Sequence, residues 1–214
     1  MRVLSQVIMV VMVAVSLVGC QSAYYGTMEK FGIHKRDILV DRVDDARDAQ
    51  SDAQEEFKSA LQRLDELLKF DGGDLEKRYQ ALNDDYERSK AAAERVNSRI
   101  KAVDNVAQAL FDEWQDELGL YSNASMRSES ERSLRETERH YKSLLQSMER
   151  AAGTMEPVLE KLHDNVLYLK HNLNAKAIDA IRGEYRVLRA DVEVLIREME
   201  AAIEASNAFI DAMR

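Results

Sequence analysis

The side chains best suited to metal binding or proton transfer are the four histidines, His34, His140, His163 and His171. None of them belongs to an HExxH motif or to another pair spaced like metal ligands on one helical face. His163 and His171 come nearest, but their spacing on a helix separates them by about 12 Å, too far to share one ion without a ligand from another helix. We therefore expect surface or capping roles and no metal site.

The acidic clusters could in principle bind calcium or supply paired acid and base catalysts. The segments 44–48 and 71–74 hold several aspartates, but neither continues into the loop of about twelve residues, ending in Glu, that calcium hands require. Pairs such as Asp84-Asp85 are typical of solvated helix faces. No nucleophile elbow, P-loop or glycine-rich dinucleotide turn is present. We expect no catalytic residue, no cofactor and no enzymatic activity, and an enzyme with an unfamiliar polar site is kept as an alternative.

The remaining candidate for chemistry is the single cysteine, Cys20. It follows an apolar run over residues 7–18 and ends the string Leu17-Val18-Gly19-Cys20, which matches the bacterial lipobox. The pattern predicts that the Cys20 thiol receives diacylglycerol and that the chain is cleaved between Gly19 and Cys20. An ordinary secretory signal and an uncleaved anchor are the alternatives. Several acyl chains on one residue hold a membrane firmly, because each buried methylene contributes about 0.8 kcal/mol.

Location and partners follow from this anchor and from charge. Gln21 would be the second residue of the mature chain, which in lipoproteins of enteric-type bacteria implies passage to the outer membrane, facing the periplasm, with the inner membrane as the alternative. The formal net charge is −9 and no stripe of Lys and Arg appears, so nucleic-acid binding is not expected. The expected partners are a membrane, through the acyl chains, and another envelope protein.

Beyond this anchor, the composition predicts an all-α fold. Eight Gly and one Pro in 214 residues leave few sharp reversals. Four stretches, roughly 38–68, 74–121, 125–172 and 178–213, carry apolar or small residues alternately three and four positions apart, which is the heptad spacing of packed helices. In the first of them, polar Gln50 fills one slot of the apolar row. Gly153 and Pro157 predict a bend in the third helix rather than an end.

Short loops at Phe70–Asp74, Tyr121–Ser125 and Asn172–Asn174 require successive helices to run antiparallel. We expect an elongated antiparallel four-helix bundle, with stacked coiled-coil hairpins as the alternative. Many Ala and Ser residues in the apolar rows predict a thin core, and a homodimer would bury more of these faces. The chain divides into a signal peptide (1–19), an acylated N-terminus with a short membrane-proximal segment (20–37) and a long-helix bundle domain (38–214).

The membrane-proximal segment mixes aromatic and basic residues. Tyr24, Tyr25 and Phe31 lie near Lys35 and Arg36, a combination suited to the lipid headgroup zone. These residues are candidate membrane contacts. The alternative is that the aromatics cap one end of the bundle, because aromatics at helical spacing usually belong to a core.

Several strings resemble a proteobacterial lipoprotein family that is described as a domain of unknown function, number 2959. They are Ser22–Tyr25, Glu29–Val43, Phe70–Leu75, Leu110–Trp114 and Leu169–Ala175. The resemblance covers the mature chain and implies a helical envelope lipoprotein, but it implies no activity, ligand or catalytic residue.

Two functions follow from the anchor, the rod and the absence of a recognisable site. The first is a noncatalytic cell-envelope lipoprotein that acts as a helical scaffold or adaptor for another envelope component. The second is a carrier or binder of a lipid or other hydrophobic ligand between the helices, which an apolar cavity would favour and a filled core would disfavour.

Overall fold

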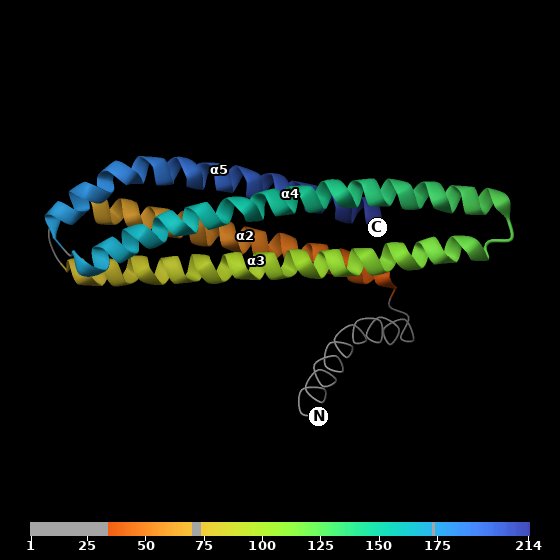
Figure 1. The fold of residues 1–214 in the computed structure, drawn as a ribbon, viewed down its shortest axis with the longest axis horizontal. Helices are drawn as coiled ribbons and strands as arrows, with labels where there is room; N and C mark the ends of the chain where they lie inside the picture. The colour runs from red at the N-terminus through yellow and green to blue at the C-terminus, as the bar shows by residue number, and fades with distance from the viewer. Residues whose placement is uncertain (1–33, 70–73, 173) are drawn as a thin grey trace, which may run out of the picture.

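The computed structural model describes residues 34–69, 74–172 and 174–214, and four long helices account for nearly all of them. They are α2 (Lys35–Leu68), α3 (Leu75–Glu117), α4 (Ala124–His171) and α5 (Ala175–Met213), with a short 3₁₀ turn, η1 (Leu118–Leu120), after α3. Figure 1 shows them side by side along one elongated rod. The expectation of an all-α, antiparallel four-helix bundle is confirmed.

Each helix packs against two neighbours: α2 against α3 and α5, and α4 against α3 and α5. We call the end that holds the α2–α3 and α4–α5 connections the loop end. At the opposite end the α3–α4 hairpin extends past the start of α2 and the end of α5 (Figure 1). This projection follows from length, because α3 and α4 have 43 and 48 residues while α2 and α5 have 34 and 39.

Three of the four long helices, α3, α4 and α5, begin with a side-chain cap. The Asp74 carboxylate accepts a hydrogen bond from the Lys77 amide, and the Asn123 side chain accepts from the amides of Ser125 and Met126. Asn174 caps α5 in the same way through Ala177. Helix α2 begins at Lys35, slightly before the expected Ile38, and α4 runs through Pro157 without ending.

The four heptad rows form the core. In α2 every row position from Leu39 to Leu67 is buried, Gln50 included. Helix α4 faces two neighbours, so it also buries side chains beside its heptad row: Leu134, Leu144, Ala151, Val158 and Asn165. Two positions of the row itself, Leu145 and Ala152, are only partly buried. Alanines make much of the middle of the core, as expected from the sequence.

An aromatic cluster closes the core near the projecting end. The ring of Tyr141 on α4 lies 5.4 Å from that of Phe111 and 6.4 Å from that of Phe209, centroid to centroid, both in edge-on geometry. The Tyr141 hydroxyl donates a 2.7 Å hydrogen bond to Asp104 on α3. Burial, and then this bond to a carboxylate, raise the pKa of Tyr141 well above its ordinary value of 10.0.

Tyr141→Phe is expected to lower the free energy of unfolding by about 1.5–3 kcal/mol, because the lost bond goes to a charged group. Since the folded state holds the proton more tightly than the unfolded chain, the native protein should lose stability from about pH 10 upward. In Tyr141→Phe that alkaline loss should be smaller. Urea unfolding followed by circular dichroism at neutral and alkaline pH measures both effects, with exposed Tyr121→Phe as the control. Equal alkaline losses in the native protein and Tyr141→Phe would contradict the assignment.

Candidate functional site

The described residues contain no group of three or more His, Cys, Asp or Glu side chains arranged to hold a metal ion. His34, His140, His163 and His171 are all exposed. The imidazole of His163 lies against the Tyr86 ring, with centroids 5.4 Å apart. The candidate binding surfaces of the described residues are apolar rather than charged.

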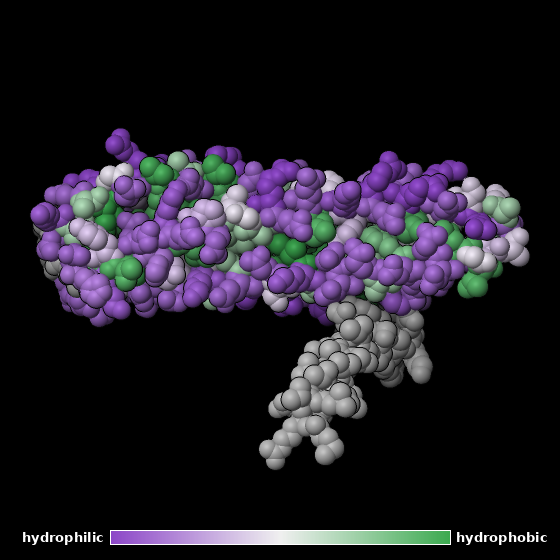
Figure 2. Space-filling view, viewed as in Figure 1, coloured by the Kyte–Doolittle hydropathy of each residue, from purple (hydrophilic) through white to green (hydrophobic). Residues whose placement is uncertain are grey.

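A groove of about 430 Å³ lies between α4 and α5 toward the loop end. Its floor is made by the buried side chains of Ile181 and Leu188, and Tyr168, which is 43% exposed, forms part of one wall. Figure 2 shows apolar side chains at the surface over this half of the rod. The groove is therefore a largely apolar depression on the side of the rod.

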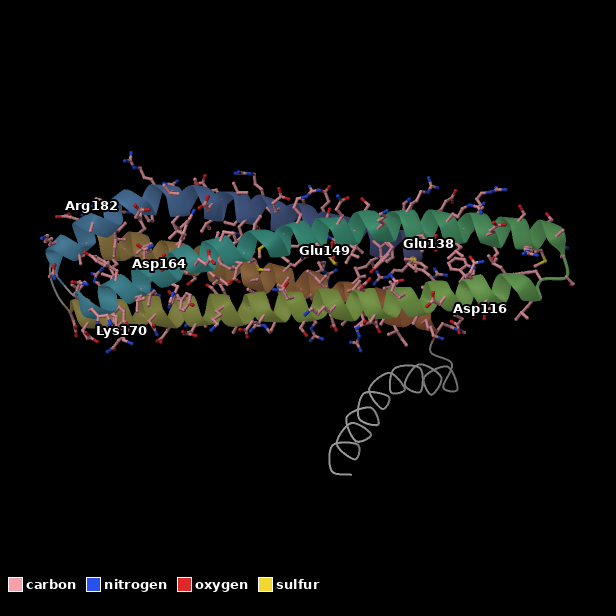
Figure 3. The ribbon with its side chains drawn as sticks, in the orientation of Figure 1. Asp116, Glu138, Glu149, Asp164, Lys170 and Arg182 are labelled. Carbon is pink, nitrogen blue, oxygen red and sulfur yellow. The ribbon has the colours of Figure 1, made fainter. Side chains whose placement is uncertain are left out.

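Two polar side chains of the groove lining, Asn165 and Lys161, have partners within the bundle. Asn165 donates through its amide nitrogen to the backbone oxygen of Lys161 at 2.7 Å, and the Lys161 ammonium bonds Asp191. Asp164 and Glu184 complete the lining, and Figure 3 shows where Asp164 lies on α4. Such an arrangement can bind an apolar surface and fix its orientation.

Helix α5 also carries a second apolar row, two positions out of phase with its buried row. We call it the outer row: Ala180, Gly183, Val187, Ala190 and Val194, all exposed. Val187 and Val194 are 50% and 41% exposed, and Ala180 also lines the groove. The alternating spacing of three and four is that of a helix–helix interface, yet no other helix of the described bundle covers it.

Gly183 is the residue in the outer row that the bundle itself does not explain. A glycine inside a helix costs about 1 kcal/mol relative to alanine. A Cβ atom added at Gly183 would meet nothing within 4 Å, so internal packing does not require its small size. The same is true of Gly153 on α4. A glycine in an exposed apolar row permits the close approach of something outside the bundle.

The residues predicted from the sequence for cleavage, lipidation or membrane contact lie partly outside the part of the chain that the structure describes. Gly19, Cys20, Tyr24, Tyr25 and Phe31 lie outside the described residues. Of the other two, Arg36 is exposed in the first turn of α2. The Lys35 ammonium bonds Glu113 of α3 at 2.7 Å, and the Lys35 side chain is only 11% exposed.

Sequence reasoning did not identify the outer row or the groove. The outer row was detectable in principle, because its members repeat at heptad spacing beside the stronger row from Ile178 to Met213. The groove was not detectable, because it depends on the separation of α4 and α5. Among the described residues, no helix combines the length and the apolar content that crossing a bilayer requires.

The family profile described as "Protein of unknown function (DUF2959)" matches residues 24–213. No curated protein matches the chain.

Proposed function

The chain belongs to the family described as protein of unknown function DUF2959, and we propose that it is a noncatalytic lipoprotein of the bacterial cell envelope that acts as a scaffold or adaptor. In this proposal Cys20 carries the acyl chains, Gln21 directs the protein to the outer membrane, and the rod presents the outer row of α5 to a helix of another envelope protein. The single observation that carries the proposal is that outer row: α5 is apolar on two faces and the bundle covers one.

The kind of partner follows from the spacing. Side chains of a second helix can insert between residues that are spaced alternately three and four apart, as in a coiled coil. Here the exposed valines would supply apolar contacts, while Gly183 and Ala190 would allow the two helices to approach closely. An amphipathic helix with small or branched apolar residues would fit this row. The groove beside it, which shares Ala180, would accept a larger side chain from the same helix.

The alternative, a carrier of a hydrophobic ligand, would use the same groove. Its apolar floor of Ile181 and Leu188 supports that reading. Against it, the described helices bury their rows on one another along the rod, and the groove is a surface feature rather than an internal cavity.

Gly183→Gln is expected to abolish cross-linking between this protein and its envelope partner while leaving the bundle folded. A Cβ atom at Gly183 meets nothing within 4 Å, so the new side chain can leave the helix without a clash at its base, and replacing glycine in a helix should maintain or raise stability. Gly153→Gln is the matched control, since it makes the same change on another helix and also points into open space. Cross-linking in intact cells followed by mass spectrometry measures the effect.

Three results would count against the scaffold proposal. One is an identical set of cross-linked proteins from Gly183→Gln, Gly153→Gln and the native chain. Another is the recovery of a stoichiometric lipid from the purified protein that Ala180→Trp excludes, which would favour the carrier. The third is the failure of labelled palmitate to enter the native chain in cells, with Cys20→Ala as the negative control, which would remove the lipid anchor.

A further inference from the structure

The tip of the α3–α4 hairpin carries an exposed apolar cluster. Leu120 is 82% exposed, Met126 is 55% exposed and Tyr121 is 40% exposed. We call these three residues the tip cluster. They lie on and just after the η1 turn, at the part of the rod that extends past α2 and α5, and Figure 3 marks the nearby Asp116 on α3. Large apolar side chains grouped at one projecting point usually mark a contact surface.

The tip cluster is held on an ordered turn. Leu118, the first residue of η1, is buried, and Asn123 caps the start of α4 through the amides of Ser125 and Met126. Just behind the turn, the Trp114 indole donates a 2.8 Å hydrogen bond to Ser130 across the two helices. The cluster therefore keeps its outward position without needing a partner to order it.

The segment around the tip cluster, residues 118–128, has far fewer charged residues than the rest of the chain. Charged residues make up 32% of the whole sequence, yet residues 118–128 contain a single charge, Arg127, and no carboxylate. Uncharged polar side chains, a tyrosine and one arginine surrounding two apolar residues suit the interface between lipid headgroups and acyl chains.

The tip also lies at the end of the rod where the N-terminal segment joins. Lys35, the first residue of α2, bonds Glu113 of α3, so the start of α2 lies beside Glu113. Leu120 follows Glu113 by seven residues, which is about 10 Å along a helix. The fourteen residues from Gln21 to His34 can span at most about 50 Å when extended. A tether at Cys20 therefore reaches past the tip easily, whereas the loop end lies a further 34 residues of α2 away.

From this placement we propose that the tip cluster inserts into the headgroup region of the membrane that holds the acylated N-terminus. This inference rests on the lipid anchor of the proposed function. The rod then has two contacts with one bilayer, the acyl chains and the hairpin tip. Two contacts fix its orientation, so that the outer row of α5 is held at a defined height above the surface.

The test uses the full-length lipidated protein, purified from cells and reconstituted into vesicles of phosphatidylethanolamine and phosphatidylglycerol with brominated acyl chains. Since Trp114 is the only tryptophan in the sequence, the Trp114→Phe variant has no tryptophan fluorescence. Tyr121→Trp then reports from the tip, and Leu167→Trp, at an exposed apolar position of α4 nearer the loop end, is the matched control. Bromine quenches an indole only at short range, so most of the emission should be lost at position 121 and almost none at position 167.

The outcomes separate this inference from the lipid anchor. Palmitate incorporation with quenching at position 121 that Leu120→Glu and Met126→Glu abolish supports the tip contact. Palmitate incorporation with no quenching at position 121, or with equal quenching at both positions, overturns the tip contact and leaves the anchor standing. Absence of palmitate from the native chain overturns the anchor, and with it the inference that depends on it.

Discussion

Replacing both Arg63 and Arg88 with methionine is expected to lower the free energy of unfolding by about 3–5 kcal/mol. The reason is Asp85 on α3, whose side chain is completely buried. Its two carboxylate oxygens bond Arg63 of α2, at 3.1 Å, and Arg88 of α3. Removing both guanidinium groups would leave a buried negative charge with no partner, and an unpaired buried charge is among the most destabilising changes that a protein core can undergo.

The converse substitution should cost much less. The side chains of Arg63 and Arg88 are 40% and 50% exposed, and each also bonds a glutamate of α2, Glu66 and Glu56. In Asp85→Leu both cations keep these partners and the solvent, so no buried charge is created. The triple variant Arg63→Met, Arg88→Met, Asp85→Leu should recover most of the stability lost in the double variant, because an apolar replacement of a buried ion pair is often neutral.

Urea unfolding followed by circular dichroism at neutral pH compares the three variants directly. The free energy of unfolding of the double variant could fall by less than about 1 kcal/mol, or the triple variant could be no more stable than the double variant. Either result would show that other groups or water stabilise the Asp85 carboxylate when both arginines are removed. The result also bears on assembly, because the pair Arg63–Asp85 joins α2 to α3 and helps to set their relative position along the rod.

Gln50→Leu is expected to raise the free energy of unfolding by about 1–3 kcal/mol. Gln50 is fully buried in the apolar row of α2, and neither its amide nitrogen nor its amide oxygen has a hydrogen-bond partner among the described residues. A buried amide without partners loses the water it bonded in the unfolded chain and gains nothing in return. Leucine at this position would continue the row that Val43, Ala46, Ala53 and Phe57 already form.

Gln54→Leu, one turn along the same helix, is the matched control. Its amide nitrogen donates to the backbone oxygen of Ile196 and to the Glu200 carboxylate, both at 3.4 Å. Removing these bonds should leave stability unchanged or lower it by about 0.5–1.5 kcal/mol. Equal losses in both variants would mean that ordered water satisfies the Gln50 amide.

A buried polar residue in a heptad row can also select one register or oligomeric state at a cost in stability. Size-exclusion chromatography of Gln50→Leu therefore belongs with the unfolding measurement. A more stable variant that changes its oligomeric state would show that Gln50 acts against an alternative association. A more stable variant of unchanged size would show that the native chain tolerates the unsatisfied amide without that benefit.

Much of the fold could be predicted from the sequence because the relevant signals are local. The alternation of three and four positions follows from the pitch of one helix, so the buried rows from Leu39 to Leu67 and from Ile178 to Met213 can be read without knowing any partner. Asp74, Asn123 and Asn174 cap helices through amides two or three residues away, so the helix boundaries are also local. Cys20 and its lipobox are a contiguous string, and their role remains a prediction.

Tertiary structure alone decided which of these helices meet and how far each slides along its neighbour. Asp85 looks like one more surface carboxylate in the sequence, and only the α2–α3 offset buries it against Arg63. The exposure of Leu120 depends on the α3–α4 hairpin extending beyond the bundle, and the groove above Ile181 depends on the separation of α4 from α5. The heptad period specifies which face of a helix is buried, but packing with residues far away in the chain fixes the offset and the spacing.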